Sequence, residues 1–150
     1  IRDDLVTGVQ TCALPIWEIV EPLITEIEKS GLKDDQVVLI CFNQDVIKEF
    51  KKARPQHKAY WLCHIKKKKG EWTPSLATVL STLRDCQADG LDSYLGIPEE
   101  YTEAVMNADY EWHAWTVNDP EVAKELVKRS ISSITTDRPK EIREALTPSK

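Results

Sequence analysis

The sequence predicts an α/β protein built from parallel strand–helix units. Short apolar runs rich in Val and Ile, such as "QVVLICF", alternate with longer segments whose apolar residues recur at helical spacing. The connections between these segments are short, and Asn, Asp or Pro stands where most of the helices begin. Strands that alternate with helices in this way form parallel sheets with right-handed crossovers.

The expected elements follow one another regularly along the chain. An amphipathic helix over 17–29 precedes five strand–helix units. The expected strands cover 36–42, 58–65, 90–96, 111–117 and 131–137, and the expected helices cover 43–55, 76–86, 98–108, 118–130 and 139–146. Asn43 is placed to cap the first of these helices, and Asn118 or Asp119 to cap the fourth. This pattern leaves a TIM-type barrel and an open doubly wound sheet equally open.

Composition limits the classes of partner. At 150 residues the chain has the size of one domain, and its net charge of −5 argues against nucleic acid as a partner. No apolar run approaches the ~20 residues of a membrane span, so we expect a soluble protein. No Gly-rich phosphate loop follows a strand. The cysteines lack metal-ligand spacing and are expected to be reduced and structural: Cys12, Cys41, Cys63 and Cys86.

Two motifs near the C-terminus carry a resemblance to a known family. The strand over 111–117 ends in the motif W-T-V-N, residues 115–118. One helix later, the last strand ends in T-D-R-P. The segments "VVLICFNQDVIKEFKKARPQHKAYWL" and "ADGLDSYLGIPEEYTEAVMNADYEWHAWTVND" also have the family layout. On these residues the chain from Trp17 to about Leu146 resembles the C-terminal part of the glycerophosphodiester phosphodiesterase family. It departs at Cys41, where relatives usually have Ser, and at 130–133, where they usually have a Gly-Val-Asp-Gly turn.

The resemblance implies a truncated TIM-type (β/α)8 barrel, with about five of eight parallel βα units present. It implies that the complete parent hydrolyses glycerophosphodiesters to an alcohol and glycerol phosphate in lipid metabolism, with the help of a divalent metal, Mg or Ca. The family's H-R-G, E-x-D and E-x-K motifs and its second catalytic His have no counterpart in this sequence. We therefore expect no catalytic residues, no metal site and no activity in this chain alone.

Residues 1–16 are expected to be a non-native leader. The stretch "VTGVQTCALPI" has neither a helical nor an alternating apolar period, and it reads back into codons as a translated sequencing-library adapter. Residues 17–150 are then the C-terminal part of a phosphodiesterase barrel domain.

Two aromatic residues at strand ends are the candidate substrate-binding residues. Trp115 and Phe42 each close a strand, and active sites of such barrels lie at the carboxyl ends of the strands. The alternative for Trp115 is an ordinary buried ring. His113 lies on the same face as Trp115, two residues deeper, and is predicted to be a satisfied core histidine.

Other polar features are given weaker or structural roles. His64 is a weaker candidate for phosphate contact, and His57 is expected to be exposed. The run "KKKKGEW" over 66–72 is predicted to be a solvated loop on the functional face. Asp137 is predicted to cap the last helix rather than to contact the glycerol moiety.

A rival interpretation comes from another class of function. A non-catalytic, flavodoxin-like α/β regulatory or binding domain would be complete with five βα units. Under the preferred interpretation the partner is a small-molecule glycerophosphodiester. Five strands of a truncated barrel form an open arc with two unpaired edges, and these edges predict self-association. The compartment is unknown from the sequence; the cytoplasm is favoured, and a signal peptide of the parent is left open.

Overall fold

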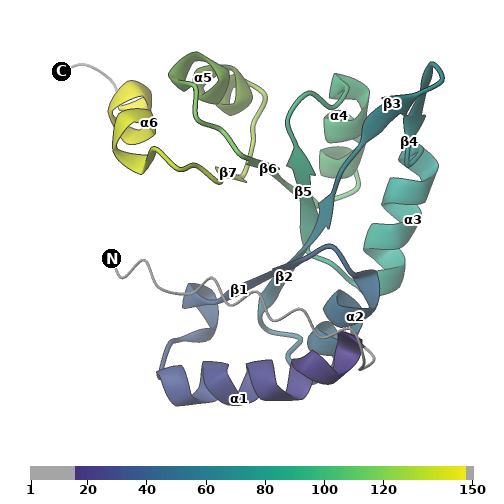
Figure 1. Ribbon diagram of the computed structural model, residues 1–150, viewed down its shortest axis with the longest axis vertical. Helices are drawn as coiled ribbons and strands as arrows, with labels where there is room; N and C mark the ends of the chain where they lie inside the picture. The colour runs from purple at the N-terminus through teal and green to yellow at the C-terminus, as the bar shows by residue number, and fades with distance from the viewer. Residues whose placement is uncertain (1–15, 148–150) are drawn as a thin grey trace.

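Strands and helices alternate along the chain as the sequence predicts. The computed structural model describes residues 16–147 (Figure 1). Its helices are α1 (Val20–Ser30), α2 (Gln44–Ala53), α3 (Leu76–Cys86), α4 (Glu99–Asn107), α5 (Pro120–Lys128) and α6 (Pro139–Leu146). Its strands are β1 (Val38–Cys41), β2 (Lys58–Cys63), β3 (Lys66–Lys68), β4 (Glu71–Thr73), β5 (Gly90–Tyr94), β6 (Glu111–Trp115) and β7 (Ser133–Ile134). Short 3-10 turns cover Ile16–Ile19 and Asp34–Gln36. Apart from Ile16, the predicted leader lies outside the described residues.

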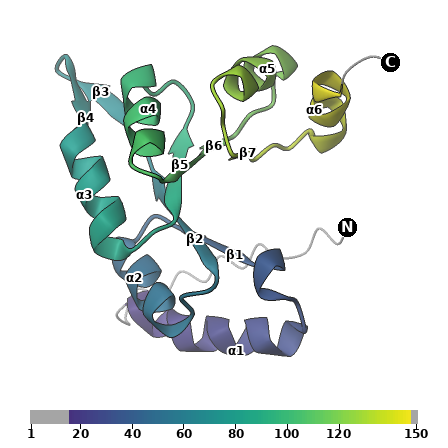
Figure 2. The ribbon, with the colours of Figure 1, turned by 180° about the vertical axis from the view of Figure 1, so that it is seen from behind.

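The sheet is a parallel half-barrel of five strands. Its order is β1-β2-β5-β6-β7, so the strands of the five predicted units are neighbours in chain order. The helices lie along the convex side of the arc and leave its concave side open (Figures 1 and 2). A flavodoxin-like sheet would instead place the second strand outside the first. The strand order therefore favours the truncated TIM-type barrel over the rival fold.

The two faces of the sheet differ sharply because successive side chains of a strand point to opposite sides. Most side chains on the helix side of the central strands are almost fully buried, among them Ala59, Leu91 and Trp112. They pack against apolar helix residues such as Ile47 and Phe50, which are completely buried. The hydrophobic core therefore lies between the sheet and its helices, and the concave face carries polar and aromatic side chains together with exposed apolar residues of β1.

One glycine allows two strands to approach closely. A Cβ atom added to Gly90 would lie 2.3 Å from the backbone oxygen of Glu111, its partner on β6. Backbone cannot yield as a flexible side chain can, so only glycine fits at this position. Gly90 thus permits the close pairing of β5 with β6.

The predicted helix caps are confirmed at two helices. The Asn43 side chain accepts hydrogen bonds from the backbone N–H groups of Asp45 and Val46. Asp119, rather than Asn118, caps α5 by accepting from the Glu121 N–H. The prediction for Asp137 is wrong: α6 has no side-chain cap, because Arg138 occupies its N-cap position and the Asp137 carboxylate binds Asn118 instead.

Two further predictions are corrected by the structure. The lysine-rich run is an antiparallel hairpin of β3 and β4, not a loop. Its two turn residues, Lys69 and Gly70, have φ of 49° and 90°, as a two-residue type I′ turn requires. His57 is buried rather than exposed, because its ring packs edge-on against Phe50 at 5.8 Å between centroids.

The thiols lie where apolar packing places them. Cys63 and Cys86 are buried and Cys41 is half-buried, and all three are free. Burial raises the pKa of the Cys63 thiol to about 12, so this thiol stays protonated and unreactive at neutral pH. These three cysteines are reduced, as predicted, and Cys12 lies outside the described residues. No helix in the described part of the chain is long and apolar enough to cross a membrane.

Candidate functional site

Four aromatic side chains from four strands meet at the carboxyl ends of the strands. Phe42 and His64 directly follow β1 and β2, while Tyr94 and Trp115 are the last residues of β5 and β6. The Phe42 and Trp115 rings meet edge to face, with 5.8 Å between their centroids. Three strand spacings of about 4.8 Å would separate these residues by roughly 14 Å in a flat sheet. The curvature of the sheet is therefore what brings the two predicted residues together.

The His64 ring lies at the centre of this aromatic cluster. It stacks on Phe42 and Tyr94, with centroids 5.9 Å and 5.1 Å away, and meets the Trp115 ring edge-on at 4.8 Å. Phe42 is 56% exposed and Tyr94 45% exposed, so the rings present an apolar surface to solvent. Trp115 is held in place because its Nε1–H donates to the backbone oxygen of Asp92 at 3.2 Å.

Tyr94 is the member of the cluster that sequence reasoning missed. Its position is fixed by the pairing of β5 with β6, in which Tyr94 lies directly opposite Trp115. The signal that could have found it is its place at the end of "GLDSY", which matches the place of Trp115 at the end of "EWHAW". The structure places His64, the weaker candidate for phosphate contact, among aromatic rings, and its contact with phosphate stays a prediction.

A polar layer lies deeper on the same face. Glu111 accepts hydrogen bonds from Lys58 Nζ at 2.5 Å and from the Tyr60 hydroxyl at 2.6 Å. Burial raises the pKa of Glu111, but these two hydrogen bonds outweigh it and the net pKa is lowered. Glu111 is therefore an ionised structural carboxylate, each of whose oxygens already accepts a hydrogen bond.

His113 is buried in this layer, as predicted. Its ring lies 3.9 Å from the Tyr60 ring between centroids, and its Nδ1 pairs with the Ser133 hydroxyl at 2.6 Å. Its Nε2 has no hydrogen-bond partner among the described residues, although Glu111 Oε2 is 3.4 Å away. Burial lowers the pKa of His113, which keeps the ring neutral at physiological pH. Only half of its hydrogen-bonding capacity is satisfied, so the prediction of a fully satisfied core histidine is wrong in this respect.

Asp92 is the most isolated charge of the inner face. It is 3% exposed, and its Oδ1 has no hydrogen-bond partner in the described part of the chain. Burial raises the pKa of this carboxyl to about 6. The inner face thus carries one buried acid that titrates near neutrality.

The described residues do not fit a divalent metal site. A hard cation needs several oxygen ligands that converge from different positions. No group of three potential ligands converges within residues 16–147. On the inner face, Glu111 is engaged by Lys58 and Tyr60. We therefore assign no metal-binding role to residues 16–147.

A hollow of about 450 Å³ lies beside the aromatic cluster rather than on it. It shares Phe42 with the aromatic cluster. The rest of its lining comes from the start of α2, from β2 and from α3 with the segment before it, and includes Asn43, Trp61, Pro74 and Thr78. Since Trp61 and Cys63 belong to the helix side of β2, this hollow opens on the convex side of the sheet. The concave face is the better candidate site because the aromatic and polar side chains converge there.

The two C-terminal sequence motifs bind each other. Asn118 of W-T-V-N accepts hydrogen bonds from the Thr136 hydroxyl at 3.1 Å and from the Asp137 N–H at 2.9 Å, and it donates to Asp137 Oδ2 at 2.9 Å. These three bonds join the segment after β6 to the segment after β7. Asp137 of T-D-R-P thus orders the rim next to Trp115.

The model of the glycerophosphoryl diester phosphodiesterase family matches residues 8–141. The chain belongs to this family. The match begins within residues 1–16, so the boundary of the predicted leader stays a prediction. No curated protein matches the sequence of this chain.

Solved structures share the fold of this phosphodiesterase-family chain. An Oleispira antarctica phosphodiesterase in complex with the product sn-glycerol-3-phosphate has a TM-score of 0.72 and 16% identity, with 87% of this chain and 49% of that one covered. A Parabacteroides distasonis glycerophosphodiester phosphodiesterase has a TM-score of 0.66 and 22% identity, with 85% and 50% covered. A Thermotoga maritima enzyme of the same name has a TM-score of 0.61 and 18% identity, with 83% and 53% covered. The chain spans about half the length of these proteins.

Proposed function

We propose that this chain supplies the aromatic wall of the substrate pocket in a glycerophosphodiester phosphodiesterase. The observation that carries the proposal is the convergence of Phe42, Tyr94 and Trp115 around His64 at the carboxyl ends of the strands. Active sites of TIM-type barrels lie at this end. The Phe42 and Trp115 rings bind the apolar carbons of a glycerophosphodiester and exclude water from its phosphate.

The chemistry of phosphodiester hydrolysis is assigned to the rest of the parent enzyme. The resemblance implies a divalent metal, Mg or Ca, and a pair of histidines for proton transfer. Among the inner-face groups of this chain, Glu111 is held by Lys58 and Tyr60, and His113 is buried beneath the aromatic cluster. We infer that the chain alone does not hydrolyse glycerophosphodiesters at a useful rate.

An activity comparison tests this inference. The purified chain is assayed against glycerophosphocholine with magnesium or calcium, beside a version extended upstream by the missing three strands. Loss of general acid–base groups alone costs typically ~10²- to 10⁴-fold in rate, so the extended version should be faster by at least that factor. A turnover by the chain close to that of the extended enzyme would mean that residues such as His64 or Asp92 do the chemistry.

The substrate role of the aromatic wall is tested in the extended enzyme. Trp115→Leu and Phe42→Leu should each raise KM by roughly fivefold, since an aromatic contact contributes about 1 kcal/mol beyond its buried area. Leu32→Ala is the control, because this side chain is 50% exposed and precedes β1 at the opposite end of the sheet. An unchanged KM in both aromatic variants would remove the pocket assignment.

We also propose that the chain self-associates through its open concave face. The inner-facing residues of edge strand β1 and its end are exposed by 47% at Val38, 49% at Ile40 and 56% at Phe42. A strand edge beside an exposed apolar row favours association. Sedimentation velocity should show mass rising with concentration, and Ile40→Lys should reduce the rise. A monomer at all concentrations would contradict this proposal.

A further inference from the structure

The β3–β4 hairpin carries the most concentrated positive charge of the described structure. Residues 66–73 hold four lysines and one glutamate, a net charge of +3, while the rest of the chain carries −8. All four lysines, Lys66 to Lys69, are exposed. The hairpin stands at the outer edge of the molecule, beyond the ends of α3 and α4 (Figure 1).

These lysines differ from four lysines on the helices of the same chain. Lys29, Lys52, Lys124 and Lys128 each form an ion pair with a glutamate three residues earlier on the same helix. Within the part of the chain that the structure describes, no such pair joins Lys66 to Lys69 to a carboxylate. The positive charge of the hairpin is therefore left for a partner outside the chain.

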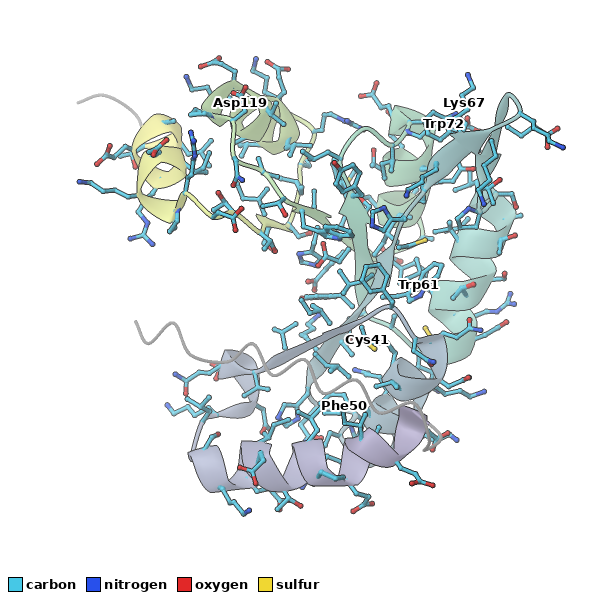
Figure 3. All side chains as sticks on the ribbon, viewed as in Figure 1. Cys41, Phe50, Trp61, Lys67, Trp72 and Asp119 are labelled. Atoms are coloured by element: carbon cyan, nitrogen blue, oxygen red, sulfur yellow. The ribbon has the colours of Figure 1, made fainter. Side chains whose placement is uncertain are left out.

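An aromatic ring stiffens the hairpin beside this charge. Lys67 pairs with Trp72 across the two strands, and Lys67 Nζ lies 5.9 Å from the centroid of the Trp72 ring (Figure 3). Trp72 is half-buried against the hydrophobic core, while Thr73 and Pro74 lead directly into α3. The lysines are thus presented on an ordered element rather than on a free loop.

We propose that the β3–β4 hairpin docks the protein on an anionic lipid surface. Three residue pairs at about 3.3 Å per residue give a projection of roughly 10 Å, which is about one Debye length at physiological salt. A flat anionic surface can therefore attract the lysines of the hairpin. The rest of the chain, which is acidic, stays about one Debye length away, so salt screens the repulsion between it and the surface. Lysines near such a surface each strengthen binding by about fivefold.

Nucleic acid is the less favoured polyanion. Its binding sites follow the backbone with basic side chains along a groove, often with aromatic platforms for the bases. Here four consecutive lysines lie on one short hairpin, and a strand running past it would meet the −8 charge of the remainder. A lipid surface needs contact with the hairpin alone.

Docking would also orient the candidate site. The hairpin begins two residues after His64, so it projects from the rim that carries the aromatic cluster. A chain docked in this way presents that rim to the surface from which glycerophosphodiesters are released. This consequence rests on the proposed function, whereas the docking itself does not.

Vesicle co-sedimentation of the whole chain tests the proposal. Vesicles of phosphatidylcholine with about one third phosphatidylserine should bind the chain, and pure phosphatidylcholine vesicles should not. Replacing Lys66, Lys67, Lys68 and Lys69 by Gln should weaken binding by on the order of 100-fold or more. Binding should also fall steeply between about 0.1 M and 0.5 M salt.

The control variant removes the same charge elsewhere. Replacing Lys29, Lys52, Lys124 and Lys128 by Gln changes the net charge equally, and it should leave vesicle binding within about twofold. Thermal unfolding of both variants verifies that they are folded. Equal losses in the two variants, binding to neutral vesicles, or tighter binding to single-stranded RNA than to anionic vesicles would overturn the proposal. Activity plays no part in the readout, so the result is independent of the proposed function.

Discussion

Replacing Asp92 by Asn should stabilise the protein at neutral pH and leave it unchanged in acid. Asp92 lies on the inner face of β5, is 3% exposed, and leaves Oδ1 without a hydrogen-bond partner among the described residues. Asn has nearly the same shape but carries no charge. The substitution therefore removes the cost of burying an ionised carboxylate while it preserves the packing of the strand.

The magnitude follows from the pKa of Asp92. Burial raises this pKa from the ordinary 3.8 to about 6, so the folded chain holds the proton more tightly than the unfolded chain does. The resulting stabilisation is complete below about pH 3.8 and is lost as the pH rises through about 6. At pH 7.5 the ionised group costs about 3 kcal/mol relative to the acid limit. Asp92→Asn should recover up to this amount.

Urea unfolding from pH 4 to pH 8 measures the effect. The free energy of unfolding of the Asp92→Asn variant should exceed that of the natural sequence by about 1–3 kcal/mol at pH 7.5, and the gap should narrow steadily toward pH 4. Asp35→Asn is the control, because Asp35 is exposed and its replacement should stay within about 0.5 kcal/mol at every pH. A gap that is independent of pH would refute the assignment of Asp92 as a buried, destabilising charge.

Three further changes test the packing. Lys51→Met should lower the free energy of unfolding in urea by about 2–4 kcal/mol, because Lys51 Nζ forms a 2.9 Å ion pair with Asp89 at a partly buried site. Lys52→Met changes an exposed neighbour and should lower it by under about 0.5 kcal/mol. Equal losses in the two variants would contradict a stabilising role for the Lys51 pair. A double-mutant cycle of Asn118→Ala and Asp137→Ala should give a coupling of about 1–2 kcal/mol, whereas additive effects would mean that the two motifs are independent. Gly90→Ala should lower the free energy of unfolding by about 1–3 kcal/mol. An unchanged free energy of unfolding would argue against the observed strand register.

The strand–helix alternation could be predicted because it depends on local periods. Side chains two apart share a face of a strand, and those three or four apart share a face of a helix, so apolar spacing alone located the five parallel strands. The Asn43 cap was equally local, since the side chain binds N–H groups two and three residues later. Barrel and open sheet were not separable in this way, because both use the same βα units.

Burial and pairing of polar segments could not be predicted locally. Four consecutive lysines have no strand period, yet Lys66 to Lys68 form a strand because β4 pairs with them across the turn at Lys69 and Gly70. His57 stands in a polar segment, but α2 and β2 close over it and place its ring against Phe50. In both cases the deciding contact comes from a partner that the local sequence does not specify.

The sequence by itself determined which residues end the strands, and the tertiary structure decided which of them meet. Phe42 and Trp115 were predictable because the carboxyl ends of parallel strands share one rim. Tyr94 joins them only through the register of β5 against β6, which places it opposite Trp115. His64 reaches the centre of the aromatic cluster because the sheet curves. The same curvature brings the Phe42 and Trp115 rings, which would be roughly 14 Å apart in a flat sheet, to 5.8 Å between centroids. Register and curvature arise from the packing of whole strands and helices, so no local period encodes them.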